Sequence, residues 1–368
     1  MRFAGSAAKT ECQTNVEKGD EMKIHCCRIV ICVLVAVVLT GCASAPLSLW
    51  QEKAPARVAL VEYVNAVTDR GSADYIPVER RIAVFDLDGT LFLETDPTYF
   101  DWLLFEHRVL EDPNYRATAE QTAVAKASRQ GKFPKLDKNR ERLVSEAYRG
   151  MTLSEFDAFV RKFMQEDQPG FTNLKRGDAF YLPMIEIVDY LRKNGFTVYV
   201  ISGTDRLTVR PLTKILHLPP HQIIGSDSTI VSDRQGNRDA LDYIYTRGDQ
   251  LVLGGKNLVK DLQMNKVSVI VREIGIQPVL AFGNTMSDAS MLNYTINGNP
   301  YRALGFMLLC DDLEREYGNL KKADQMRRDC QKYGWIPVSM RDDWKTIYGD
   351  QVKIRKKAQT PKKSLQEK

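Results

Sequence analysis

Residues 81–94 read RIAVFDLDGTLFLE and place two carboxylates, Asp86 and Asp88, directly after a short apolar run. The run at 82–85 is typical of a buried strand, which Gly89 is expected to end. Burying one ionised carboxylate is costly, and a second one beside it adds to that cost. We therefore expect the two acids to have a function that requires them at this point of the chain.

The composition is that of an ordinary globular protein with one large or two modest domains. Of the 368 residues, 43% are hydrophobic and 27% are charged. The net charge is only +5, and much of the excess lies in the tail at 351–368, which we expect to be disordered and solvated. Because no basic stripe alternates with aromatic residues elsewhere, nucleic-acid binding is not expected.

The N-terminal segment has the pattern of an export signal. From Met22 the chain reads MKIHCCRIVICVLVAVVLTGCASAP, in which eleven apolar residues at 29–39 follow a positively charged start. That run is too short for a membrane anchor helix but suits a signal peptide. The tetrapeptide LTGC at 39–42 resembles the lipobox of bacterial lipoproteins, which implies lipidation of Cys42 and a lipid-anchored protein on the periplasmic face of the cell envelope, at the outer membrane.

These features suggest that translation starts at Met22 and that the leader and signal peptide at 1–41 are removed. A tether and one helix would then fill 42–80. Removal of the leader and lipidation would leave Cys310 and Cys330 as free thiols or as a disulfide, and the sequence favours neither.

Apolar spacing predicts alternating helices and strands along most of the chain. Helices are expected at 55–71, 97–110, 153–165, 181–195, 207–218, 265–275 and from 287, strands at 81–86, 196–203 and 278–283, and short strands with hairpin turns at 222–233 and 242–255. Alternation of this kind predicts an α/β fold with a parallel sheet, its core at 81–94 and 181–350. The segment 95–180 has helical patterns without a clear strand and is predicted to be a helical cap domain.

Polar residues follow several of the predicted strands and should meet at the carboxyl edge of the sheet. Asp86, Ser202 and Asn284 each come directly after an apolar strand. Two adjacent carboxylates are tolerated when a divalent cation lies between them, and oxygen ligands suit Mg²⁺. The Gly203 N–H and the Lys266 ammonium would stabilise a phosphoryl group at the same edge.

Four segments resemble the motifs of the haloacid dehalogenase superfamily, most closely its phosphoserine-phosphatase-like branch. They are DLDGT at 86–90, VISGT at 200–204, Lys266, and GNTMSD at 283–288. The resemblance implies a Rossmann-like core sheet with a helical cap inserted after the first strand. An EF-hand calcium loop is excluded, because the twelfth position from Asp86 is Pro97 instead of a glutamate.

The resemblance also implies a role for each motif residue. Asp86 would be the nucleophile that forms an aspartyl-phosphate, and Asp88 the general acid and then the general base. The other roles would be Mg²⁺ binding by Asp86, Asp88, Asn284 and Asp288, phosphate binding by Ser202, Gly203 and Lys266, and support of the first loop by Thr90. Asn284 stands where the family usually has an aspartate, so the metal site has one negative charge fewer. Lys256 is a rival to Lys266, which is preferred because its helix leads into the strand at 278–283.

The cap residues after the first motif are expected to select the substrate. Glu94 is the candidate contact, because phosphoserine phosphatases carry an acid facing the substrate amine at this point. Glu94 and Asp96, together with the aromatic side chains of Tyr99, Phe100, Trp102 and Phe105, could hold a cationic group. The favoured alternative is that the aromatic residues form the buried face of a cap helix.

The sequence thus predicts a Mg²⁺-dependent phosphomonoesterase for a small phosphoserine- or phosphocholine-like metabolite. The alternative is a catalytically silent lipoprotein that keeps the fold as a binding module.

Overall fold

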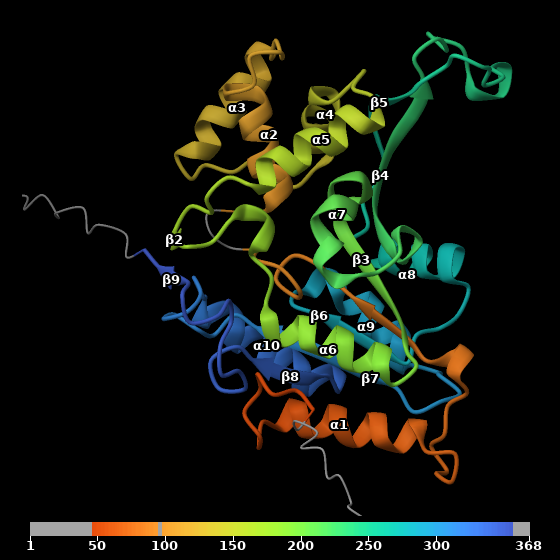
Figure 1. The fold of residues 1–368 in the computed structure, drawn as a ribbon, viewed down its shortest axis with the longest axis vertical. Helices are drawn as coiled ribbons and strands as arrows, with labels where there is room; N and C mark the ends of the chain where they lie inside the picture. The colour runs from red at the N-terminus through yellow and green to blue at the C-terminus, as the bar shows by residue number, and fades with distance from the viewer. Residues whose placement is uncertain (1–45, 95–97, 356–368) are drawn as a thin grey trace, which may run out of the picture. The chain divides into compact units, whose positions relative to one another are not determined.

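A seven-stranded sheet lies at the centre of the computed structural model, which describes residues 46–94 and 98–355 (Figure 1). Its strands have the order β5-β4-β3-β1-β6-β7-β8, and all neighbours are parallel except β4 and β5. The strands are β1 (Ile82–Phe85), β3 (Thr197–Asp205), β4 (Ile223–Ser232), β5 (Leu251–Val259), β6 (Leu280–Gly283), β7 (Leu304–Leu309) and β8 (Ile336–Ser339). The predicted α/β fold with a mainly parallel core sheet is confirmed.

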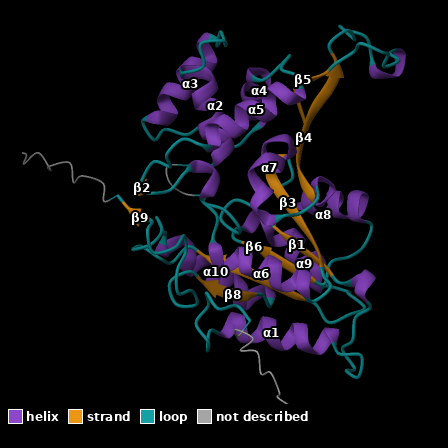
Figure 2. Cartoon of the chain, viewed as in Figure 1, coloured by secondary structure: helices purple, strands orange, loops and turns teal. Residues whose placement is uncertain are grey.

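Helices cover both faces of this sheet (Figure 2). One face packs against α1 (Pro55–Thr68) and α6 (Leu182–Lys193), and the other against α8 (Met264–Val269), α9 (Ala289–Ile296) and α10 (Leu320–Tyr333). Along β1, Ala83 and Phe85 belong to the first of these two cores, whereas Ile82 and Val84 belong to the second. Burial on both faces explains why β1 is apolar throughout. The helix predicted at 265–275 is α8 followed by a π-helical turn at Ile270–Ile274.

Stacked aromatic rings hold three neighbouring strands in register. Phe85 on β1 pairs with Phe282 on β6, which pairs with Phe306 on β7. The ring centroids are 4.3 Å and 4.8 Å apart, and the rings are nearly parallel. Because Phe85 and Phe282 are paired, the residues that follow them on the two strands lie side by side at the carboxyl edge of the sheet.

The cap is helical, as predicted. It comprises α2 (Phe100–Leu110), α3 (Ala119–Arg129), α4 (Lys138–Ala147) and α5 (Leu153–Met164). Thr118 and Thr152 precede α3 and α5 and cap their N-termini with capping boxes. In each box, the side chain of the third helical residue, a glutamine or a glutamate, accepts a hydrogen bond from the main-chain N–H of the threonine.

Main-chain hydrogen bonds join the cap to the edge of the core sheet. The Gly150 N–H donates to the Leu253 carbonyl over 2.8 Å, and the Leu253 N–H donates to the Met151 carbonyl over 2.9 Å. Leu253 lies on β5, which is longer than the short strand predicted there. The helix α5 also packs against α7 (Arg206–Leu212) of the core. The antiparallel edge of the sheet therefore fixes the cap in place.

Part of the C-terminal tail is ordered, contrary to expectation. The tail was expected to be disordered from residue 351, but Lys353–Ile354 form β9, which pairs with β2 (Phe171–Thr172). Cys310 and Cys330 are both free thiols.

The leader, Cys42, Asp96 and the tail beyond 355 lie outside the described residues. Within the described part, no helix has the length and apolar character needed to cross a membrane.

Candidate active site

The first predicted motif forms a tight loop at the carboxyl end of β1. The Asp86 N–H donates to the Phe282 carbonyl over 2.9 Å, and the Thr90 hydroxyl lies 3.4 Å from Asp86 Oδ2. Gly89 has a φ of 82°, and a Cβ there would lie 1.8 Å from the Nδ2 atom of Asn284. The loop needs a glycine for both reasons, since other residues rarely adopt this conformation and none would fit beside Asn284.

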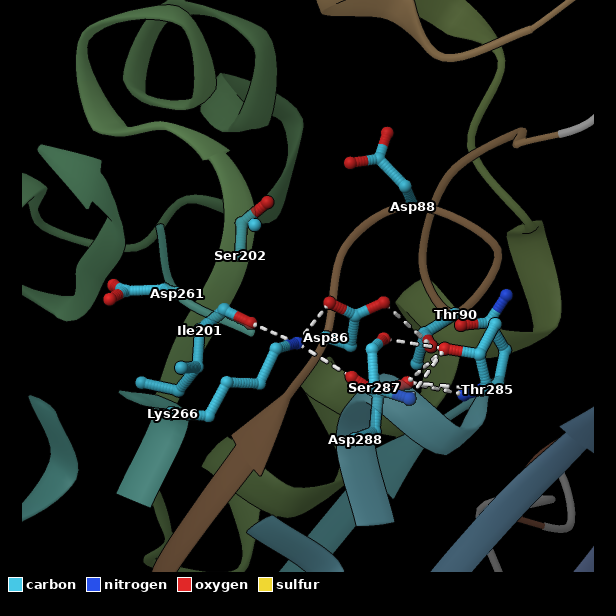
Figure 3. A network of polar contacts seen from close by, with 12 residues as sticks. Asp86, Asp88, Thr90, Ile201, Ser202, Asp261, Lys266, Thr285, Ser287 and Asp288 are labelled. Carbon is cyan, nitrogen blue, oxygen red and sulfur yellow. Dashed lines mark hydrogen bonds and ion pairs between the residues drawn. The ribbon is translucent and has the colours of Figure 1, made fainter. Parts of the chain in front are cut away.

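Lys266 lies at the centre of the polar network in Figure 3. Its Nζ atom contacts an Asp86 oxygen, Asp288 Oδ1 at 2.7 Å and the Ile201 carbonyl at 2.8 Å. Burial lowers the pKa of Lys266, but Asp288 and Asp86 outweigh this effect and raise it. Lys256 is exposed on β5, so Lys266 is the lysine that reaches Asp86.

Asp288 organises the loop after β6. Its Oδ2 atom accepts hydrogen bonds from the N–H groups of Asn284 and Thr285, over 3.0 Å and 3.1 Å. Because its other oxygen contacts Lys266, both carboxylate oxygens have protein partners. Asp288 therefore fixes the position of Asn284 and the charge of Lys266.

Asp88 lies apart from the Lys266 network (Figure 3). Its Oδ2 atom accepts a hydrogen bond from the Thr204 hydroxyl over 2.8 Å, while its buried Oδ1 atom has no hydrogen-bond partner among the described residues. Burial, followed by the charges of Asp101 and Asp86, raises the pKa of Asp88 well above its usual value. Burial and the charge of Asp288 raise the pKa of Asp86 to about 7. A carboxyl group that holds its proton to higher pH than usual suits Asp88 for donating a proton.

In the second motif, Ser202 and Gly203 occupy different environments. The Ser202 hydroxyl is fully buried and accepts a hydrogen bond from the Thr204 N–H over 3.0 Å. Gly203 and Thr204 line the adjacent pocket, whereas Ser202 does not. The sequence analysis did not predict the contact between Thr204 and Asp88, although Thr204 belongs to the VISGT segment.

Core and cap residues enclose one pocket of about 370 Å³. Its lining includes Asp86, Asp88, Gly203, Thr204 and Asn284 from the strand ends, Glu94, Tyr99, Asp101 and Arg140 from the segment after β1 and the cap, and Lys260 and Lys322 from later segments. Of the aromatic residues considered above, Tyr99 lines this pocket, while Phe100, Trp102 and Phe105 are buried. The interpretation of these three as the buried face of a cap helix is therefore correct.

Glu94 is already bound by protein groups on both oxygens. Its Oε1 atom accepts a hydrogen bond from the Tyr99 hydroxyl over 3.0 Å. Its Oε2 atom accepts hydrogen bonds from Asn284 Nδ2 over 3.0 Å and from Lys322 Nζ over 2.7 Å. Lys322 lies on α10, far beyond the last motif, and no sequence pattern indicated it.

The residues present fit a magnesium ion. Three His, Cys, Asp or Glu side chains do not converge anywhere in the described parts of the chain. The predicted ligands would instead combine carboxylate, main-chain carbonyl and amide oxygens, and Mg²⁺ needs only one or two carboxylates because it keeps several waters. Asp86, Asp88 and Asn284 line one pocket, so these oxygen-bearing groups face the same space.

Comparisons with known proteins agree with this reading of the motifs. The family model described as haloacid dehalogenase-like hydrolase matches residues 83–293. A search of curated proteins finds no match.

Several solved structures are similar at low sequence identity. A protein of unknown function from Bordetella pertussis Tohama I is 14% identical, with a TM-score of 0.45 over 70% of this chain and 98% of that chain. A cytosolic 5'-nucleotidase IIIB bound to cytidine is 14% identical, with a TM-score of 0.47 over 81% and 91% of the two chains. A phosphoserine phosphatase in apo form is 15% identical, with a TM-score of 0.34 over 69% and 98%. Likenesses at this level carry no argument about activity.

The raised pKa of Asp88 predicts a pH-dependent stability for the metal-free protein. Between the usual aspartate pKa and the raised one, the folded state binds more protons than the unfolded chain, so stability falls as pH rises. Asp88→Asn removes this titration and keeps an acceptor for Thr204. Its stability relative to wild type should rise as the pH increases above about 4, by up to about 1.4 kcal/mol for each pH unit below the raised pKa.

Urea unfolding in EDTA, followed by circular dichroism, measures this difference. Asp324→Asn, at an exposed position on α10, is the control and should show a constant difference from wild type. A constant difference for Asp88→Asn as well would contradict the assigned environment of Asp88.

Proposed function

Because the chain belongs to the haloacid dehalogenase-like hydrolase family, we propose that it hydrolyses phosphomonoesters through an aspartyl-phosphate on Asp86. The match over residues 83–293 confirms the family resemblance that the four motifs indicated. One observation carries the proposal. The ionisable nucleophile Asp86 and the more easily protonated Asp88 line the same pocket, and only Asp86 contacts the Lys266 ammonium.

The two acids divide the reaction into two displacements. In the first, an Asp86 oxygen forms a bond to phosphorus as the bond to the leaving-group oxygen breaks, and Asp88 gives its proton to that oxygen. In the second, Asp88 takes a proton from a water whose oxygen attacks phosphorus, which releases phosphate and restores Asp86. The Gly203 N–H would bind phosphoryl oxygens, and the Lys266 ammonium would hold the Asp86 carboxylate and offset the developing charge.

Magnesium would be held by Asp86, the main-chain carbonyl of Asp88 and the amide oxygen of Asn284. When bound, it supplies charge neutralisation between the Asp86 carboxylate and the incoming phosphate. Asp288 was predicted as a further ligand. We propose that it acts indirectly, because its two oxygens already bind Lys266 and the main chain of the Asn284 loop.

The first test removes the nucleophile. Asp86→Asn keeps the size of the side chain but weakens its nucleophilic oxygen, so hydrolysis of p-nitrophenyl phosphate with Mg²⁺ should fall at least ~1000-fold, which corresponds to about 4 kcal/mol of the barrier. EDTA should abolish wild-type turnover, and excess Mg²⁺ should restore it. Folding is checked by circular dichroism. Wild-type turnover in Asp86→Asn would contradict the mechanism, and phosphate binding without turnover of any ester by wild type would favour the silent binding module.

The charges in the pocket favour a leaving group that carries an acid. Lys322 already neutralises Glu94, so Glu94 is not available as the carboxylate that a cationic group, as in a phosphocholine-like substrate, would need. Asp101 and Glu141 share the ammonium group of Lys260, over 3.9 Å and 3.1 Å.

Arg140 is a cation of the pocket that is left for a substrate acid. Its guanidinium stacks 4.4 Å from the centre of the Trp102 ring and makes no ion pair among the residues that the structure describes. We therefore propose a small phosphorylated acid, phosphoserine-like in its carboxylate, as the substrate class.

Arg140→Gln tests this substrate class. Loss of one charge-assisted hydrogen bond costs about 1.5–3 kcal/mol, so kcat/KM for phosphoserine should fall about 10- to 100-fold while p-nitrophenyl phosphate is affected much less. Arg142→Gln is the matched control on the same helix, because Arg142 is paired with Glu120 and Glu146. If phosphocholine is the best substrate and Arg140→Gln leaves the order of substrates unchanged, the acidic leaving group is excluded.

We also propose that the protein is attached to the bacterial cell envelope through lipid on Cys42. The support is the lipobox-like LTGC segment after a short apolar run. Each buried methylene of an acyl chain contributes about 0.8 kcal/mol, so several chains are needed for stable attachment. In bacterial cells, Cys42→Ser should therefore leave an unprocessed precursor or release the protein from the membrane fraction. Normal processing and membrane attachment of this variant would contradict the assignment.

A further inference from the structure

The residue at 284 is an amide that has to present one particular end to a metal ion. A carboxylate can offer either oxygen, but an asparagine has one acceptor oxygen and one NH₂ donor on the same planar group. Metal ions of the magnesium class bind the oxygen. An asparagine at this position works as a ligand only if its amide is held in the correct one of two orientations.

Glu94 selects that orientation. An ionised carboxylate only accepts hydrogen bonds, so Glu94 Oε2 takes the Nδ2 donor of Asn284, over 3.0 Å. The reversed amide would place the Asn284 oxygen against the Glu94 carboxylate, which is unfavourable at a buried site. Both side chains are only 6% exposed, so water cannot easily take the place of either partner.

Glu94 is itself held by two further side chains. Lys322 Nζ donates to the same Oε2 atom over 2.7 Å, and the Tyr99 hydroxyl donates to Oε1 over 3.0 Å. Burial lowers the pKa of Lys322, but the neighbouring charges, that of Glu94 foremost, raise it overall. A Cβ on Gly89 would lie 2.9 Å from Glu94 Oε2 as well as 1.8 Å from Asn284 Nδ2. The loop that carries Asp86 is thus shaped around the hydrogen bond between these two residues.

We infer that Glu94 is a positioning residue that turns the amide oxygen of Asn284 toward the magnesium ion, with Lys322 and Tyr99 fixing Glu94. The inference rests on the proposed magnesium-dependent function. In this arrangement the Glu94–Asn284 pair performs the role of a single aspartate. Glu94 acts through Asn284 and does not touch the substrate.

A double-mutant cycle separates orientation from charge. Calorimetry on metal-free protein measures the Mg²⁺ Kd of wild type, Glu94→Gln, Asn284→Asp and the double variant. The amide introduced by Glu94→Gln can donate to or accept from Asn284 and so no longer selects one orientation, whereas the carboxylate introduced by Asn284→Asp is symmetric and needs no selection. Glu94→Gln should therefore weaken Mg²⁺ binding about tenfold more in the wild-type background than in the Asn284→Asp background. A pure charge effect would be equal in both backgrounds and would overturn the inference.

Two further measurements keep the result decisive. Glu141→Gln removes a negative charge close to the pocket, on the Lys260 side, without touching Asn284, and should change the Kd less than threefold. If Asn284→Asp alone does not fold, the ¹⁵N side-chain signals of Asn284 replace it. Slow solvent exchange of these NH₂ protons in wild type and fast exchange in Glu94→Gln support the inference, and unchanged exchange overturns it.

Failure of the inference differs from failure of the proposed function. Turnover of p-nitrophenyl phosphate by wild type, with equal effects in the two backgrounds, removes the inference alone. Coupled Mg²⁺ binding without turnover removes the phosphatase proposal alone.

Discussion

The buried contact of Lys266 with Asp86 and Asp288 is the constraint around which the edge of the sheet is built. Two carboxylates at this depth would be strongly destabilising without a counter-charge, and removal of one partner from a buried ion pair is costly. The lysine reaches them from α8, and its third contact is the carbonyl of Ile201 within β3. One ammonium group thus joins β3 to the segments that follow β1 and β6, and the fold and the site depend on the same charge.

Much of this arrangement could be predicted from the sequence, because it depends on local pattern. Apolar runs ending in Asp86, Ser202 and Asn284 indicate strands that carry polar groups at their carboxyl ends, and parallel pairing brings such ends together. The choice of Lys266 over Lys256 also followed from chain order. In the cap, helical spacing placed Phe100 and its neighbours in the core without any knowledge of the partners.

Other features depend on contacts between distant segments, which sequence patterns do not encode. Lys322 has the appearance of an ordinary helix lysine, and only packing of α10 brings it to Glu94. The antiparallel pairing of β5, which fixes the cap through Leu253, follows from strand register and was expected only as short hairpins. The tail pattern was misleading for a similar reason, because β9 forms through pairing with β2 despite a strongly basic sequence.

Lys322 also limits how this protein can be divided or recombined. The family match ends at residue 293, before α10 begins, so a piece cut at that boundary retains all four motifs and still lacks the cation that neutralises Glu94. A glutamate without its counter-charge would then stand beside the loop that carries Asp86. The module that can be exchanged intact with related proteins is therefore longer than the matched core, and its C-terminal helix belongs to it as fully as the strand that carries Asp86.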